Sequence, residues 1–262
     1  MKIASWNVNS INARIEHLIF LIKDNNLDII LLQELKCIND MFPFKVIEEL
    51  GYNCYVNGQK AWNGVAILSK KKLDIKNKKI PTYNEDDNSR FIETEIKLTK
   101  IKKNIKLFCI YLPNGNPIES EKFDYKIKWM KKFNKYIESL YKENFPIIIG
   151  GDFNVIPTDD DVYNPANFKD DACAHPKTRE QFRILLNLGL TDVAKFFLEG
   201  KSNWTFWGYR GGGWQKGNGL RIDHFLTSPE ITDNISSVKI NRNIRGMEKA
   251  SDHAPIIIDL NN

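Results

Sequence analysis

The chain has 262 residues and a formal net charge of +5, with 42% hydrophobic and 27% charged residues, which is an ordinary globular composition. Its apolar runs fall far short of the roughly 18–20 residues that a membrane-spanning helix needs. The four cysteines show no CxxC spacing that would indicate a zinc site, and a disulfide framework is not expected at this size. A strand signal starts directly after Met1 and leaves no room for a signal peptide. We therefore expect a soluble, cytoplasmic protein without membrane association and with a mild preference for anionic partners.

Apolar strand signals alternate with helical spacings along the chain, which predicts a mixed α/β fold of stacked layers. Strands are expected at residues 3–6, 28–32, 105–110, 147–149, 220–222 and 254–260, and helices at 11–22, 46–50, 123–140 and 178–188. Between residues 58 and 98 the pattern changes to hairpins, with GVAILSK followed by FIETEIKL. Loops 157–177 and 208–219 are long enough to indicate a functional or mobile segment. No linker is apparent, so residues 1–262 are predicted to form a single domain.

Lysines gather in two kinds of segment. The runs at residues 70–72 and 76–79 are interpreted as flanks of exposed hairpins or loops, with contact to a phosphate backbone as the alternative. The helical stripe at 123–140 is interpreted as core packing with a solvated lysine face. Its polar positions include Lys126, Lys128, Lys131, Lys132 and Lys135.

The segment FPIIIGGDFN, residues 145–154, carries the clearest functional signal. Its three isoleucines form a β-branched run that predicts a strand buried on both faces. Asp152 follows at the end of this strand, and Asn154 points the same way if the chain remains extended. The carboxylate can take a proton from water or bind a metal, and the amide can hold an oxyanion. The alternative is an ordinary Asp/Asn turn after a strand.

Polar residues also stand at the ends of five further apolar segments. Side chains this polar are seldom buried without a partner. A single sheet edge that gathers all of them therefore explains the pattern more simply than six independent turns. We call this predicted grouping the polar edge. Its members are Asn7, Asn9, Gln33, Glu34, Tyr111, Asn114, Asp152, Asn154, Asp223, Asp252 and His253.

The polar edge is rich in carboxylate and amide oxygens and contains no thiolate. Such a set favours Mg²⁺, with Mn²⁺ as a substitute, over Zn²⁺. Mg²⁺ usually takes one or two protein carboxylates and keeps its waters, which leaves room for a substrate phosphate. The remaining carboxylates would then be free for proton chemistry.

His253 is the histidine most suited to a functional role. A carboxylate on its ring N–H would orient the ring and raise its pKa, so that it could donate to a phosphate oxygen. His224 alternates with Asp223 and is therefore expected to face away from that carboxylate and to be structural.

Aromatic residues cluster after residue 200. Trp204, Phe206 and Trp207 precede Tyr209, Arg210, three glycines and a further tryptophan. Aromatic side chains interleaved with Arg and Gly suit stacking on nucleobases or on an exposed sugar. A core tryptophan cluster is the competing interpretation.

Seven segments occur in this order over the whole chain: KIASWNVNSINAR, ILLQELK, IYLPNGNP, EKFDYKIKWM, IIIGGDFNV, GLRIDHFLTS and KASDHAPI. Together they closely resemble the exonuclease III family, the bacterial abasic-site endonucleases and 3′-repair nucleases of the endonuclease/exonuclease/phosphatase superfamily. The resemblance implies a four-layer α/β sandwich of the deoxyribonuclease I type, with two packed mixed β-sheets flanked by helices. It also implies a monomeric, Mg²⁺-dependent DNA repair nuclease acting on double-stranded DNA at abasic sites and at blocked 3′ ends.

Residue by residue, the resemblance implies Glu34 as the principal Mg²⁺ ligand, with Asn7 and Asp252 nearby. It implies that Asp152 orients or deprotonates the attacking water with support from Asn154.

The resemblance further implies that Tyr111 and His253 hold the scissile phosphate and that Asp223 pairs with His253. An apolar wall would receive a flipped-out abasic deoxyribose. Asn9 stands where certain relatives have a second acidic residue. The DNA-contacting positions implied are Arg90, Asn114, Phe206, Trp207 and Leu220.

Two alternatives remain open from the sequence. A phosphoesterase acting on a phospholipid or inositol phosphate would share the polar edge but should lack the GYRGGGW loop and the LPNG turn. A non-catalytic nucleic-acid-binding regulator would show a degenerate polar edge, whereas every expected catalytic position is filled here.

Overall fold

The structure is a computed structural model that describes residues 1–200 and 202–261. In this part of the chain the strands form two sheets of six strands. The first sheet contains, in spatial order, β11 (Ile235–Ile240), β12 (Ile256–Leu260), β1 (Lys2–Asn7), β2 (Ile29–Gln33), β4 (Val65–Ser69) and β3 (Asn53–Asn57). The second contains β5 (Ile75–Asn77), β6 (Phe91–Ile96), β7 (Ile105–Tyr111), β8 (Ile147–Asp152), β10 (Asp223–Thr227) and β9 (Thr191–Asp192).

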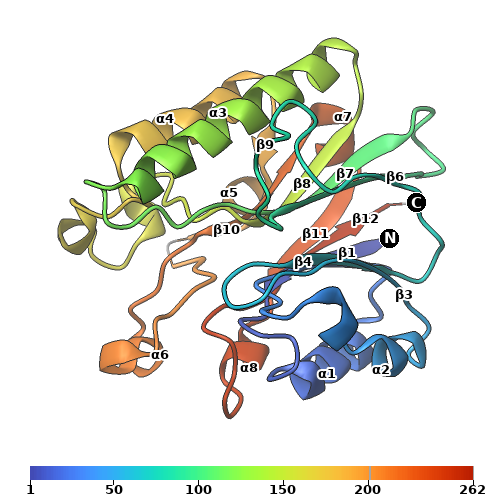
Figure 1. The fold of residues 1–262 in the computed structure, drawn as a ribbon, viewed down its shortest axis with the longest axis horizontal. Coiled ribbons are helices and arrows are strands. Elements are labelled where there is room, and N and C mark those ends of the chain that lie inside the picture. Colours follow the sequence, from blue (N-terminus) through green and yellow to red (C-terminus); the bar gives the residue numbers. More distant parts are fainter. Residues whose placement is uncertain (201, 262) are drawn as a thin grey trace.

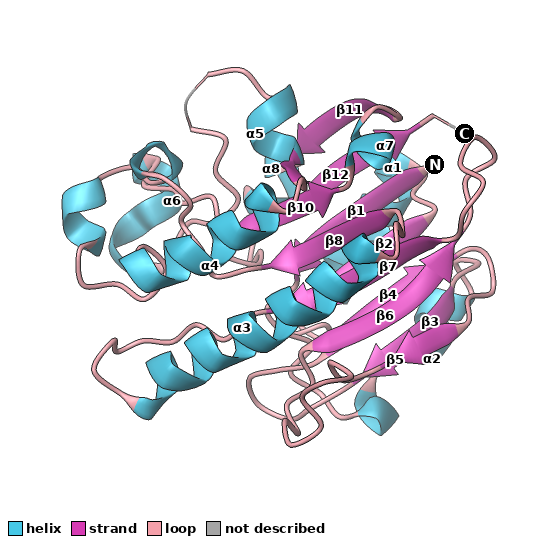
Figure 2. Cartoon of the chain, turned by 90° about the horizontal axis from the view of Figure 1, so that it is seen from above, coloured by secondary structure: helices cyan, strands magenta, loops and turns pink. Residues whose placement is uncertain are grey.

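The two sheets pack face to face, and helices cover their outer faces (Figure 1). Helices α1 (Ile15–Asn25) and α2 (Phe44–Glu48) lie on the first sheet, whereas α3 (Glu121–Lys142) and α4 (Pro176–Asn187) lie along the second (Figure 2). Separate apolar cores fill the space between the sheets and beneath each helical layer. The predicted four-layer α/β sandwich is therefore confirmed. The short helices are α5 (Val193–Phe197), α6 (Gly213–Lys216), α7 (Pro229–Thr232) and α8 (Arg242–Arg245).

Each sheet is built around one parallel pair, β1 with β2 and β7 with β8, and its other pairings are antiparallel. The carboxyl ends of the two parallel strands in each pair therefore lie at the same edge. Antiparallel β12 and β10 bring their first residues to that edge as well. Because Asn7 at the end of β1 bonds to Asp152 at the end of β8, the two sheets present these ends side by side.

Three expectations about the elements need correction. The helix predicted from residue 11 begins at Ile15, because Asn9 and Ser10 adopt positive φ angles and Ile11 is buried in the connecting loop. The strand predicted at 220–222 begins only at Asp223, where β10 starts. Lys126, expected on a solvated lysine face, is 0% exposed. The hairpins predicted between residues 58 and 98 are confirmed, because β4 pairs antiparallel with β3 and β6 pairs antiparallel with β7.

None of the helices within residues 1–200 and 202–261 combines the length and apolar character that crossing a bilayer requires.

Candidate active site

The polar ends of the strands meet in one cleft of about 630 Å³. The predicted grouping at one edge is present, because six chain segments deliver their polar side chains to this place. Asn7 and Asp223 lie directly behind the lining and bond to residues that form it. The predicted residues that line the cleft are Asn9, Glu34, Tyr111, Asn114, Asp152, Asn154, Phe206, Leu220, Asp252 and His253.

Asp152 is held rigidly at the end of β8. Asn7 Nδ2 donates to Asp152 Oδ2 at 2.9 Å, and the backbone N–H of Asn154 donates to Oδ1 at 2.9 Å. The strand can come this close to β7 because Gly151 has no side chain, and a Cβ there would lie 2.0 Å from the Ile110 carbonyl oxygen. Burial and the neighbouring Asp223 carboxylate raise the pKa of Asp152, which makes it a better proton acceptor.

His253 and Asp223 form a buried pair beside Asp152. His253 Nδ1 lies 2.9 Å from Asp223 Oδ2, which also accepts a hydrogen bond from Thr205 Oγ1 at 2.6 Å. Burial lowers the pKa of His253, but the ion pair and hydrogen bond with Asp223 outweigh this effect and raise the pKa to about 10. His253 Nε2 is 3.9 Å from Asp152 Oδ2 and remains available to a ligand in the cleft. The predicted partnership of Asp223 and His253 is present.

Glu34 follows β2 in a left-handed conformation, with a φ of 52°, which is uncommon for a residue other than glycine. Tyr111 donates its hydroxyl to Glu34 Oε1 at 2.5 Å, and Lys36 Nζ lies 3.0 Å from Oε2. Burial, followed by the Glu34 charge, raises the pKa of Tyr111 well above its usual value. The phenol therefore stays protonated and acts as a donor.

Asn9 connects the remaining polar groups. Its side-chain amide donates to Asp252 Oδ1 at 2.9 Å, and its Oδ1 accepts from Lys36 Nζ at 2.5 Å. Its backbone N–H donates to Asn7 Oδ1 at 3.0 Å. The sequence interpretation missed Lys36, although its place two residues after Glu34 in the LQELK segment could have indicated it.

The donor set fits a metal ion. The Lys36 ammonium lies between Glu34 Oε2 and Asn9 Oδ1, so oxygens already converge on a positive charge there. A second set of potential metal ligands has its ligand atoms within 4.8 Å of one another and consists of Asp152, Asp223 and His253. In this set, Asp223 and His253 already bond to each other. The all-oxygen character near Glu34 suits a hard divalent cation.

An apolar wall closes one side of the cleft. Phe206 and Leu220 pair through an antiparallel bridge, and the Phe206 ring lies 4.9 Å from the His253 ring. Loop 157–177 completes this wall with Tyr163 and Phe168. The sequence interpretation expected this loop to be functional or mobile but did not identify these two aromatic residues.

Comparison with known proteins agrees with this geometry. Residues 4–253 match the model of the endonuclease/exonuclease/phosphatase family. The chain belongs to this family. It is 35% identical over 268 residues to exodeoxyribonuclease III of Haemophilus influenzae, covering 98% of each chain, and 30% identical to an exodeoxyribonuclease of Bacillus subtilis over the full length of both.

Solved structures place the chain in the same group. A 3′ phosphatase from Neisseria bound to a product DNA hairpin has a TM-score of 0.94 and 33% identity, with both chains fully covered. An AP endonuclease from Archaeoglobus fulgidus has a TM-score of 0.91 and 31% identity over all of both chains. The predicted exonuclease III relationship is therefore confirmed, and the chain is an enzyme of the phosphodiester-hydrolysing type.

Two of the residues predicted to contact DNA, Trp207 and Arg90, pack against aromatic side chains in this nuclease. Trp207 is 2% exposed and packs its ring 4.9 Å from that of Trp214, so it offers no stacking surface and the core interpretation holds for it. Arg90 does not line the cleft. Its guanidinium lies over the Tyr111 ring, 4.9 Å from the centroid, and donates to the Tyr111 carbonyl at 3.2 Å. Arg90 therefore supports Tyr111, and because it is only half-buried, its contact with DNA stays a prediction.

Lys126 is a further residue that the sequence interpretation misplaced. From within α3 its Nζ donates to the carbonyl oxygens of Asn114, at 3.0 Å, and Asn154, at 2.6 Å. Burial lowers the pKa of this amine. The lysine therefore ties together the two loops that carry Asn114 and Asn154 at the cleft.

Proposed function

We propose that this protein is a Mg²⁺-dependent DNA repair nuclease that hydrolyses phosphodiesters at abasic sites and at the 3′ ends of duplex DNA. One observation carries the proposal: a buried proton acceptor and two hydrogen-bond donors surround one cleft beside an apolar wall. Asp152 is the acceptor, and Tyr111 and His253 are the donors.

The proposed metal site consists of Glu34 as principal ligand, with Asn7 and Asp252 nearby. When bound, Mg²⁺ would neutralise charge on the substrate phosphate and position it. Lys36 already neutralises part of the Glu34 charge and is the residue that an entering cation would displace.

The chain's own groups perform the proton chemistry in this proposal. Asp152, its oxygens oriented by Asn7 and by the Asn154 backbone N–H, accepts a proton from the attacking water. The His253 imidazolium, held by Asp223, donates from Nε2 to a phosphate oxygen. The single Tyr111 hydroxyl proton, which goes to Glu34 Oε1 in this structure, would turn to the same phosphate once a cation engages the Glu34 carboxylate. These donors stabilise the negative charge that grows on the phosphate in the transition state.

Lesion preference is assigned to the apolar wall. An abasic sugar has no stacking or pairing to lose, so extruding it costs less than extruding an intact nucleotide by roughly a few kcal/mol. Phe206 and Leu220, with Phe168, would favour the compact apolar face of this sugar, and a bulky base would clash with them.

The test uses a duplex with one abasic analogue and a second duplex with a 3′-phosphate. We expect incision with Mg²⁺ or Mn²⁺ and none in EDTA, and full activity in EDTA would refute the metal assignment. Phe206→Ala should reduce abasic incision more than 3′-phosphate removal. Phe196→Ala, which truncates an exposed aromatic residue, is the matched control. Equal losses on both substrates would refute the role of Phe206 in recognition.

A single catalytic domain spanning residues 1–262, a monomeric state and a cytoplasmic location complete the proposal. The exodeoxyribonuclease and AP endonuclease relatives favour DNA over a phospholipid or inositol phosphate as substrate. The free state of Cys37, Cys54, Cys109 and Cys173 is compatible with a reducing compartment. Size-exclusion chromatography with light scattering would test the monomer.

A further inference from the structure

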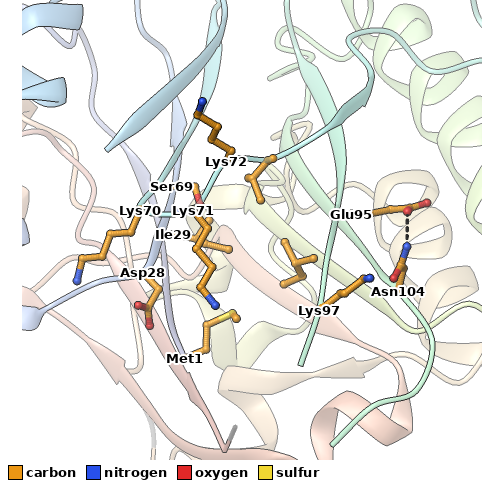
Figure 3. A pocket seen from close by; sticks show the side chains of 12 residues that line it. Met1, Asp28, Ile29, Ser69, Lys70, Lys71, Lys72, Glu95, Lys97 and Asn104 are labelled. Carbon is orange, nitrogen blue, oxygen red and sulfur yellow. Dashed lines mark hydrogen bonds between the residues drawn. The ribbon is translucent and has the colours of Figure 1, made fainter. Parts of the chain in front are cut away.

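A second cavity, of about 570 Å³, is shown from close by in Figure 3. Ile29 at the start of β2 and Ile96 at the end of β6 line it. Glu34 follows the far end of β2, five residues from Ile29, which corresponds to roughly 16 Å along an extended strand. The cavity is therefore separate from the catalytic cleft.

The inner surface of this cavity is apolar. Ile29 and Ile96 are 3% and 5% exposed and belong to the core between the two sheets, and half-buried Leu73 packs against them. The floor of the cavity is therefore the edge of the inter-sheet core. A volume of this size is in the range of pockets that hold small molecules.

The mouth of the cavity carries uncompensated positive charge. Lys71 and Lys97 are exposed, and their ammonium groups make no hydrogen bond or ion pair within residues 1–200 and 202–261. Figure 3 shows these two lysines on opposite sides of the opening, Lys71 beside β4 and Lys97 on the β6 side.

Two carboxylates line the cavity, against the four lysines Lys70, Lys71, Lys72 and Lys97. Asp28 accepts from the backbone N–H of Lys2 at 2.8 Å. Glu95 accepts from Lys106 Nζ and Asn104 Nδ2, each at 2.7 Å. Neither carboxylate contacts Lys71 or Lys97, so the mouth can attract an anion.

We propose that this cavity binds a small amphiphilic anion. An apolar body lies in the cavity against half-buried Leu73 and the edges of Ile29 and Ile96, and an anionic head group lies between Lys71 and Lys97. A carboxylate, a sulfonate or a phosphate monoester with an alkyl or aryl body meets this description. Nucleic acid does not, because its charged backbone has no apolar body to fill the cavity.

Isothermal titration calorimetry with decanoate, below its micelle-forming concentration, tests the proposal. We expect saturable binding of decanoate, weaker binding of decanol and no binding of acetate. Dodecanoate should bind more tightly than decanoate, by up to roughly fourfold for each added methylene that is buried. Decyl phosphate and decyl sulfonate distinguish the head groups. Equal affinity for decanoate and decanol would overturn the proposal. The absence of saturable binding of both decanoate and dodecanoate would overturn it as well.

The variants identify the site. Lys71→Ala combined with Lys97→Ala should lower decanoate affinity towards that of decanol, and Leu73→Trp should block binding by filling the cavity. Lys131→Ala combined with Lys135→Ala, two exposed lysines on α3, is the matched control and should leave decanoate binding unchanged. A single-stranded oligonucleotide should not displace decanoate. Displacement of decanoate by the oligonucleotide would show that Lys71 and Lys97 bind nucleic acid instead. Unchanged decanoate affinity in the Lys71→Ala, Lys97→Ala double variant would refute the site.

Discussion

Replacing Lys126 by Met tests whether a buried ammonium group positions the catalytic loops. Met has a similar length and no charge, so the change removes the two hydrogen bonds to the carbonyls of Asn114 and Asn154 with little loss of packing. Each bond from a charged donor is worth roughly 1.5–3 kcal/mol, and the two carbonyls would be left unpaired. Relief of the cost of burying the ammonium offsets part of this loss. We therefore expect the free energy of unfolding to fall by about 1–3 kcal/mol.

The effect on catalysis should exceed the effect on stability. Asn154 has a φ of 49°, and its backbone N–H orients the Asp152 carboxylate, so releasing its carbonyl frees the segment that aims the proton acceptor. A misplacement of about 1 Å at a reacting group can cost on the order of 10²-fold in rate. We expect kcat on an abasic duplex to fall by about that factor while DNA binding persists.

Urea unfolding and single-turnover kinetics measure the two effects separately. Lys131→Met is the matched control, because Lys131 lies on the same helix but is exposed. Unchanged stability would show that the two carbonyls do not depend on Lys126. Lower stability with unchanged kcat would refute the positioning role and leave Lys126 only a structural one.

Three further predictions concern the polar edge itself. Glu34→Ala should sharply raise the Mg²⁺ concentration needed for half-maximal activity, and an unchanged Mg²⁺ titration would exclude Glu34 as the principal ligand. Asp152→Asn should lower kcat by several orders of magnitude while abasic DNA still binds in a gel-shift assay; near-normal turnover would exclude Asp152 as the proton acceptor. In metal-free protein, NMR titration should find the His253 imidazole charged well above pH 6.5, with the pKa lowered in Asp223→Asn. Because the folded pKa is raised, the stability from this pair is present below a pH of about 6.5 and lost as the pH rises through about 10; an ordinary His253 pKa would contradict the pairing.

The sequence alone determined the strand ends and the chemistry they carry. Runs such as Ile147–Ile149 are wholly apolar because both faces of their strand are buried, and this pattern is visible locally. Polar residues directly after such runs, such as Glu34 and Asp152, must lie at the edge of a sheet. The order of the motifs then indicated the exonuclease III family, and with it the four-layer fold.

Only the tertiary structure decided which sheet each strand joins and which neighbours each polar group meets. β4 is a continuous apolar run and β6 an alternating one, and they belong to different sheets. Neither pattern predicts this assignment, because hydrophobicity indicates which faces of a strand are buried and not which partner buries them. Arg221 illustrates the same limit: its buried guanidinium bonds to Asp161 and Asp192, which stand 60 and 29 residues away in the chain. Burial depends on contacts between segments distant in sequence. The sequence alone therefore did not predict that Lys126, in a helical stripe, is buried against two carbonyl oxygens, or that Trp207, in a loop, is buried against the ring of Trp214.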